Sequence, residues 1–245
     1  MQKYDHKYQL SAGKFIFVPT KETLQEGLKI KKYLENKWIA PNFYYHFISG
    51  GHVRAIKKHL GQDWFIHVDI EKFFYQATQT KLTRSLFALL KDYKIAREIA
   101  KKSTVYSVLN EKKTWHLPYG FPQSSILASI CLNHSKLGKY LNQLNSTGYK
   151  ISIYVDDIII SGNNTQRNIQ LETIKNIAKE ASFKLNSNKT YFSNNEVEAF
   201  NIILNKLSTH ITQKRMDVFN CIIKDPEENF LRKKAILAYI KSIEG

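Results

Sequence analysis

The sequence predicts an α+β fold in which short antiparallel strands and helices are interleaved along 245 residues. Two segments have the short apolar or alternating pattern typical of strands, KFIFVP at residues 14–19 and KISIYVDDIIIS at residues 150–161. Between them, apolar residues recur at helical spacing from Ile126 to Leu141. A hydrophobic content of 43% allows a sizeable core, so the chain is one large domain or two interlocked subdomains.

Four elements are predicted after the strand at 14–19, in the first part of the chain. Thr20 is a helix cap with an acidic residue in the first turn, and Pro41 marks the end of that helix. Residues 50–61 (GGHVRAIKKHLG) have one apolar face and predict a short helix. A further strand ends near Asp69, and a helix rich in leucine follows it.

The rest of the chain predicts a second hairpin, several more helices and two late strands. The hairpin has the polar turn NEKK at residues 110–113, and one long helix is expected to run from Ile126 to Leu141. Helical spacing returns at 165–181, and strands follow in KTYFS and FNIILN. A last helix is expected to start at Asp225, because Pro226 and two acids follow this cap.

The charge balance is strongly basic. Lys and Arg number 37 against 21 acidic residues, which gives a formal net charge of +16 and favours a polyanionic partner. That charge also suits a ribosomal protein or a protein of the membrane surface. No apolar stretch approaches the roughly 18 residues of a membrane span, so we expect a cytoplasmic protein without a membrane partner.

Two adjacent aspartates, Asp156 and Asp157, lie between two apolar runs of the pattern YVDDIIISG. Adjacent carboxylates repel each other, and a tight turn forms at lower cost with Asn-Gly or Asp-Gly. A solvated turn is the alternative interpretation. Asp69 also ends an apolar strand, and three such oxygen donors predict a Mg²⁺ site, in which two ions stabilise the oxygens of a phosphoryl transfer.

Five segments in this order resemble the motifs of reverse transcriptases. They are HVDIEKFF, LPYGFPQSSILAS, YVDD, FKLNSNKT and FNIILN. The LP-x-G-x-P-x-S motif is most similar to that of the prokaryotic enzymes of retrons, group II introns and phage defence. The resemblance implies a right-hand polymerase fold with an antiparallel-sheet palm. Fingers and palm would occupy residues 1–205, with the palm mainly at 62–82 and 117–205, and a short helical thumb would occupy 206–245.

The resemblance also implies roles for the acidic residues. Asp69 and Asp156 would bind two catalytic Mg²⁺ ions, with Mn²⁺ as a substitute, and the backbone carbonyl of Ile70 would assist them. Asp157 would be the third acid of the site, less central to metal binding.

Further residues would contact the incoming nucleotide. Phe74, five residues after Asp69, matches the aromatic residue that excludes a 2′-OH and so selects dNTPs; from the residues alone, a core aromatic is the better interpretation. Lys14 stands where relatives carry Arg and would contact the triphosphate, or would be an exposed strand lysine. Lys189 matches a lysine near the pyrophosphate leaving group, where it could supply a proton.

The LPYGFPQSS loop departs from the family pattern at two positions. Tyr119 stands where Gln is usual, and Ser125 where Pro is usual. The usual Gln touches the nucleotide, so Tyr119 brings nucleotide selection and templated synthesis into question. Gly120 would let the nucleotide approach the backbone closely, and Gln123 would neighbour the template or nucleotide.

The function implied is RNA-directed DNA synthesis in a prokaryotic defence or retron-like system. Its partners would be an RNA template, the DNA product and dNTPs, together with a noncoding RNA and a partner protein or a second copy of the chain. Two alternatives stay open: a template-independent or protein-primed DNA polymerase, and a nonenzymatic nucleic-acid-binding subunit that has the same fold.

Overall fold

The computed structural model describes residues 2–11, 13–109, 112–164 and 170–245. The chain divides into two compact units, each assembled from separate stretches of sequence. We call Met1–Pro41, Ile70–Gln143 and Ile174–Leu185 the first unit. The second unit consists of Asn42–Asp69, Leu144–Thr173 and Asn186–Gly245. Each unit therefore depends on pairing between segments that are distant in the chain.

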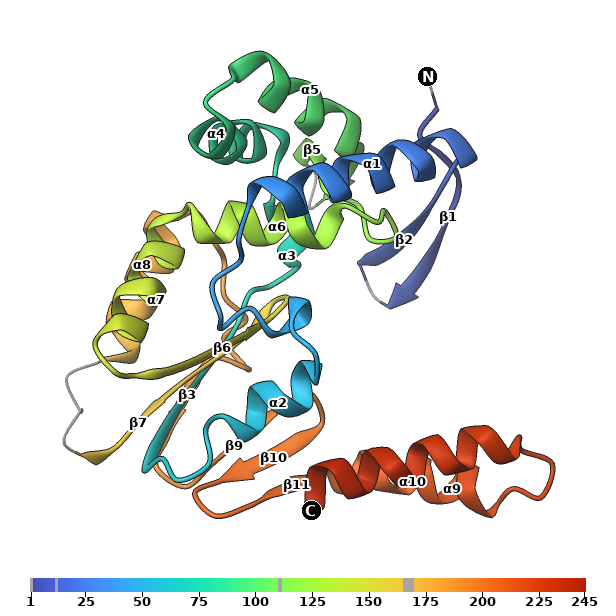
Figure 1. The fold of residues 1–245 in the computed structure, drawn as a ribbon, viewed down its shortest axis with the longest axis vertical. Coiled ribbons are helices and arrows are strands. Elements are labelled where there is room, and N and C mark those ends of the chain that lie inside the picture. The colour runs from blue at the N-terminus through green and yellow to red at the C-terminus, as the bar shows by residue number, and fades with distance from the viewer. Residues whose placement is uncertain (1, 12, 110–111, 165–169) are drawn as a thin grey trace. The chain divides into compact units, whose positions relative to one another are not determined.

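The second unit contains an antiparallel sheet, which in the described part of the chain has four strands (Figure 1). Their order is β6 (Lys150–Tyr154), β7 (Asp157–Gly162), β3 (Trp64–Asp69) and β8 (Tyr191–Ser193). Every residue of β3 is buried, and four of its six residues are apolar. The predicted strand ending at Asp69 and the hairpin around the paired aspartates are confirmed.

The remaining elements of the second unit, apart from one short 3-10 helix, share one apolar core with this sheet. They are η1 (Tyr45–Phe47), α2 (Gly51–Lys57), β9 (Glu196–Ala199), β10 (Ile202–Asn205), β11 (Thr209–Ile211), α9 (Gln213–Lys224) and α10 (Phe230–Glu244). Phe65 and Ile159 of the sheet pack in one buried cluster with Ile56 of α2, Phe219 of α9 and Ile243 of α10. Burial of such side chains stabilises a fold by about 1.5–3 kcal/mol each, so this cluster fixes the sheet that carries the aspartates.

The first unit is mainly helical, with two hairpins. Its elements are β1 (Tyr4–Ser11), β2 (Lys14–Pro19), α1 (Lys21–Lys37), α3 (Phe73–Gln76), α4 (Gln79–Leu90), α5 (Tyr93–Ser103), β4 (Val105–Leu109), β5 (Lys112–His116) and α6 (Ser124–Asn133). Two helices, α7 (Lys136–Ser146) and α8 (Leu171–Glu180), begin in one unit and end in the other. Among the described residues, no helix has the length and apolar content needed to cross a membrane.

The start of α1 forms as the sequence predicts. The Thr20 hydroxyl accepts the backbone N–H of Thr23 at 3.2 Å, and Glu22 lies in the first turn near the positive end of the helix dipole. The helix ends at Lys37, four residues before Pro41.

Two predicted helices have different boundaries in the structure. The long helix from Ile126 to Leu141 is interrupted: α6 ends at Asn133, and Ser135 caps a new helix by accepting the N–H of Gly138 at 3.1 Å. The last helix begins at Phe230, not at Pro226, because Asn229 supplies its cap by accepting the Leu231 N–H at 2.8 Å.

Other differences concern elements that the sequence prediction missed. Asp225 closes α9, and its carboxylate accepts the N–H of Glu227 at 2.9 Å in a local turn. The strands β1, β9 and β11 and the helix α5 were not predicted. Residues 165–169 of one predicted helix, and residues 110–111 of the NEKK turn, lie outside the described residues.

Candidate active site

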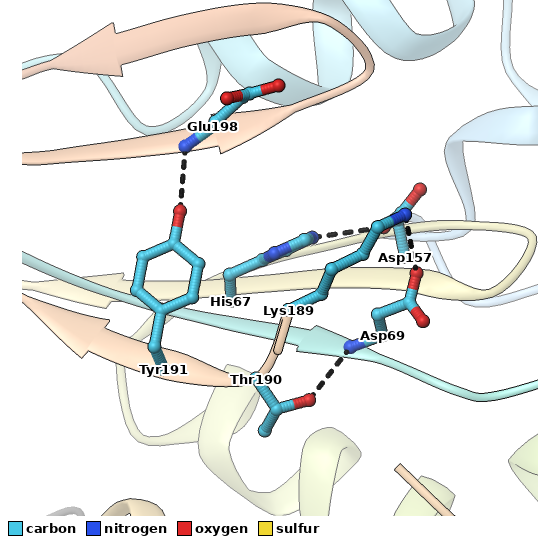
Figure 2. A network of polar contacts seen from close by, with 7 residues as sticks. All are labelled: His67, Asp69, Asp157, Lys189, Thr190, Tyr191 and Glu198. Atoms are coloured by element: carbon cyan, nitrogen blue, oxygen red, sulfur yellow. Dashed lines mark hydrogen bonds and ion pairs between the residues drawn. The ribbon is translucent and has the colours of Figure 1, made fainter. Parts of the chain in front are cut away.

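Asp69 and Asp157 face each other on neighbouring strands of the second unit. Asp69 is the last residue of β3 and Asp157 the first of β7, and the two are directly paired in the antiparallel register. Directly opposed residues have Cβ atoms about 4.5–5.5 Å apart. The backbone of Asp69 is held on its other side, because its N–H donates to the Thr190 hydroxyl at 3.3 Å (Figure 2). The sheet therefore fixes two carboxylates together.

Asp156 lies in the turn between β6 and β7, directly after a residue with unusual backbone geometry. Val155 has a φ of +60°, a left-handed conformation that is strained for a β-branched residue. Its N–H donates to Nδ1 of His46 at 3.1 Å. Burial lowers the pKa of His46 to about 4, so at neutral pH the ring is uncharged and can accept this hydrogen bond.

Lys189 brings the three carboxylates into one electrostatic group. Its Nζ lies 3.5 Å from Oδ2 of Asp69. Burial by itself would lower the pKa of this amine, but the charges of Asp69, Asp157 and Asp156 outweigh burial and raise the pKa above its ordinary value. One ammonium group thus lies in the combined field of all three predicted acids.

His67 also belongs to this site, although sequence reasoning missed it. Its Nε2 lies 3.0 Å from Oδ1 of Asp157 (Figure 2), and since a carboxylate can only accept, Nε2 carries the proton. The ring of Tyr191 packs edge-on against His67, and the Tyr191 hydroxyl accepts the Glu198 N–H at 2.9 Å. The sequence signal that could have identified His67 is the two-residue period of a strand. His67 and Asp69 are two residues apart on β3 and therefore lie on the same face.

The donor chemistry of the three aspartates fits a divalent cation. Among the described residues, no group of three or more His, Cys, Asp or Glu side chains is arranged so that it could hold a metal ion as it stands. Carboxylate oxygens are nevertheless the ligands that Mg²⁺ prefers. The raised pKa of Lys189 shows that positive charge is stabilised beside them, and a cation needs this same field.

In the first unit, three predicted nucleotide contacts form one cluster around Tyr119. The Tyr119 ring lies 4.6 Å from the ring of Phe74 and 4.4 Å from Nζ of Lys14. The Tyr119 carbonyl accepts the N–H of Phe17 at 2.9 Å, which ties the loop to β2. Gly120 follows with a φ of +103°, and a Cβ there would lie 2.3 Å from the Phe17 carbonyl oxygen. Only glycine fits this position without strain.

Two other predicted residues lie deeper in the first unit. Gln123 is buried at the start of α6, and its Nε2 donates to the Ser103 hydroxyl at 3.3 Å. Ile70 is fully buried and pairs with Leu185 in an isolated antiparallel bridge. The structure therefore groups Lys14, Phe74 and Tyr119 in the first unit, and the aspartates with Lys189 in the second.

The fold that carries these carboxylates is similar to that of nucleic-acid polymerases. The chain matches the reverse transcriptase (RNA-dependent DNA polymerase) family over residues 23–218, which is more than half of its length. It belongs to the reverse transcriptase family. A search of curated protein sequences found no match.

Solved polymerase structures share this fold at low sequence identity. A human picobirnavirus RNA-dependent RNA polymerase aligns with a TM-score of 0.56 and 13% identity, covering 94% of this chain and 49% of that chain. Telomerase from Candida albicans aligns with a TM-score of 0.53 and 12% identity, covering 78% of this chain and 38% of that chain. The chain thus spans about half or less of the length of these proteins. The α+β class and polymerase architecture expected from the sequence are confirmed.

Proposed function

We propose that this protein is an RNA-directed DNA polymerase that adds dNTPs to a primer 3′-OH. The observation that carries the proposal is the pairing of Asp69 with Asp157 across β3 and β7, with Asp156 beside them. All three acids act on the Lys189 amine, and the chain belongs to the family whose description names this activity.

In this proposal Asp69 and Asp156 hold two Mg²⁺ ions, which Mn²⁺ can replace, and the Ile70 carbonyl assists. Two such ions, when bound, stabilise the attacking and leaving oxygens of an in-line phosphoryl transfer. Asp157, whose Oδ1 accepts from His67, completes the acidic group and is less central to metal binding. Lys189, whose Nζ lies 3.5 Å from Oδ2 of Asp69, is proposed to supply a proton to the departing pyrophosphate.

The first unit supplies the proposed nucleotide contacts. Lys14 binds the triphosphate as a point charge, and Phe74 excludes a ribose 2′-OH by its bulk. Gly120 exposes its backbone for close approach, and Gln123 supports the loop from its buried position at the start of α6.

The decisive experiment is Mg²⁺-dependent dNTP incorporation by the wild-type chain and by Asp156→Asn. We expect the variant to lose incorporation because it loses a carboxylate ligand. The matched control is Asp63→Asn, which removes a half-buried carboxylate just before the other end of β3, where Asp63 pairs with Lys206 at 2.6 Å. Asp63 lies about 20 Å along the strand from Asp69. Equal incorporation by Asp156→Asn and Asp63→Asn would remove the site assignment.

A second candidate is a template-independent or protein-primed DNA polymerase, which Tyr119 favours. An aromatic ring, packed between Lys14 and Phe74, replaces the amide that relatives place next to the nucleotide. The test is to supply defined RNA templates and sequence the product. Product complementary to no supplied or co-purified RNA would select template-independent synthesis, and complementary product would exclude it.

The proposed partners are an RNA template, the DNA product and dNTPs, with a noncoding RNA and a partner protein or second copy. The LP-x-G-x-P-x-S motif of residues 117–124 supports a role in a prokaryotic defence or retron-like system. Sequencing the nucleic acid that co-purifies with the protein tests this role. If the folded protein yields no incorporation at all, the nonenzymatic nucleic-acid-binding alternative replaces the proposal.

A further inference from the structure

An exposed pair of aromatic rings lies on the β4–β5 hairpin of the first unit, outside the groups described above. Tyr106 of β4 and Trp115 of β5 are directly paired in the antiparallel register, with ring centroids 5.3 Å apart. The two residues are 46% and 44% exposed. We propose that Tyr106 and Trp115 form a base-stacking platform for unpaired nucleic acid, and that its occupant is the single-stranded template.

One face of this hairpin is buried and the other is exposed to solvent, as a surface that binds a ligand requires. Val105 and His116, which alternate with the aromatic pair, are buried. Val105 packs in a buried cluster with Phe17, and the His116 ring lies 6.3 Å from the Phe17 ring. The hairpin is therefore anchored through its other face, and the Tyr106 and Trp115 rings remain available to a ligand.

Positive charge accompanies the rings. Nζ of Lys3 lies 5.2 Å from the centre of the Trp115 ring and donates to the carbonyl oxygens of Lys101 and Thr104, which fix its place. Lys113 is exposed and lies two residues before Trp115, so it shares the outward face of β5. Lys101 is also exposed. Aromatic rings beside lysines are the combination that binds single strands, because bases stack on the rings while phosphates meet the charges.

An unpaired strand fits this surface better than a duplex does. Bases inside a duplex already stack on each other and cannot lie on a side-chain ring, whereas the bases of a single strand have free faces. Identifying the strand as the template rests on the proposed function. Binding of a single strand does not, because it requires neither a metal ion nor a nucleotide.

Trp115 provides a direct probe of this binding. Of the three tryptophans, Trp38 is 7% exposed and Trp64 is 1% exposed, so an added ligand reaches Trp115 first. We expect an oligouridine of about 12 nucleotides, a length within the range of single-strand sites, to quench the intrinsic fluorescence. Trp115→Phe should retain binding, since phenylalanine also stacks, but should lose most of the quenching. Full quenching in Trp115→Phe would contradict the proposal.

Affinity is measured by fluorescence anisotropy of the labelled oligouridine, in EDTA and without dNTP. Trp115→Ala and Tyr106→Ala should each weaken binding roughly 5- to 100-fold, the range that corresponds to loss of one stacked base. Lys113→Ala should instead reduce the slope of log affinity against log salt by about 0.7. A blunt duplex of equal length should bind with no dependence on Trp115.

The matched control is Tyr93→Ala. Tyr93 is also in the first unit, is 57% exposed, and makes an edge-on contact with Phe87 at 6.2 Å. If Trp115→Ala and Tyr106→Ala weaken binding no more than Tyr93→Ala does, the pair only stabilises the hairpin and the proposal is wrong. Circular dichroism shows whether an alanine variant is folded. If it is not, the difference in fluorescence quenching between wild type and Trp115→Phe tests the proposal instead.

The outcome is separable from that of the proposed function. Asp156→Asn should bind oligouridine as the wild type does. If oligouridine stacks on Trp115 but the protein incorporates no dNTP, the base-stacking platform stands and the polymerase assignment is wrong. If the protein incorporates dNTPs but binds oligouridine equally well without either ring, the polymerase assignment stands and the platform is wrong.

Discussion

Nε2 of His67 lies 3.0 Å from Oδ1 of Asp157, and this hydrogen bond joins β3 to the first residue of β7. The Nδ1 atom of the same ring is buried without a hydrogen-bond partner among the described residues. The hydrogen bond from Nε2 is therefore the contact through which the imidazole orients a carboxylate of the proposed active site.

Replacing His67 should weaken the response to Mg²⁺. His67→Leu removes the donor and lets Asp157 rotate, and loss of such a supporting partner typically costs 10–100-fold in metal affinity or activity. His67→Gln, which keeps an N–H donor, should recover part of the loss. The measurement is incorporation as a function of Mg²⁺ concentration, with His210→Leu, an exposed histidine of β11, as control. An unchanged Mg²⁺ dependence in His67→Leu would show that the contact is only structural.

Phe74→Leu should increase the use of ribonucleotides. Phe74 is buried and packs against Tyr119, so truncation to alanine would cost about 3–5 kcal/mol of stability, whereas leucine keeps most of the volume. Phe73→Leu is the matched control, because its ring lies 6.0 Å from that of Phe74 and is also buried. Competition between rNTP and dNTP measures the change. Equal selectivity in both variants would make Phe74 a core residue and nothing more.

Gly120→Ala should destabilise the protein more than Gly61→Ala does. Both glycines have positive φ values, so alanine costs of order 1 kcal/mol at either position. At Gly120 the added Cβ also meets the Phe17 carbonyl at 2.3 Å, whereas at Gly61 it meets nothing within 4 Å. Urea denaturation gives the two free energies of unfolding. Equal losses would mean that the loop moves away from β2 without cost.

Protein stability should fall in acid because His59 must remain neutral. Nδ1 and Nε2 of His59 lie 2.7 and 2.8 Å from the hydroxyls of Ser161 and Ser152. Burial, followed by the charges of Lys58 and Lys150, lowers its pKa to about 3. The unfolded chain, with an ordinary pKa near 6.5, binds the proton first, so stability is lost as pH falls below that value.

Between pH 7 and pH 5 the contribution of His59 amounts to about 2 kcal/mol. The measurement is the free energy of unfolding in urea at both pH values, for the wild type and for His59→Gln. The variant should lose about 2 kcal/mol less than the wild type over this interval. Its remaining pH dependence includes His46, whose pKa is also lowered by burial. Parallel curves for the two proteins would contradict the assignment.

Much of the candidate site could be predicted because its signals are local in sequence. Asp69 and the Asp156–Asp157 pair were recognised from apolar runs that end in acids, and the cap at Thr20 from a pattern of three residues. The break between α6 and α7 was missed because the apolar spacing continues across it, while the Ser135 cap competes with helix continuation. The start of α10 was misplaced because Asp225 and Asn229 are both good caps, and Asp225 forms a local turn with Glu227 instead.

The sequence by itself determined the chemistry that this chain can carry: three carboxylates at strand ends, a basic surface charge and the motif order of a reverse transcriptase. Only the tertiary structure decided which groups meet. The contacts of His67 with Asp157, His46 with Val155 and Tyr106 with Trp115 each depend on strand register or on the packing of distant segments. A shift of one residue in register turns every side chain to the opposite face, and no short motif encodes that choice.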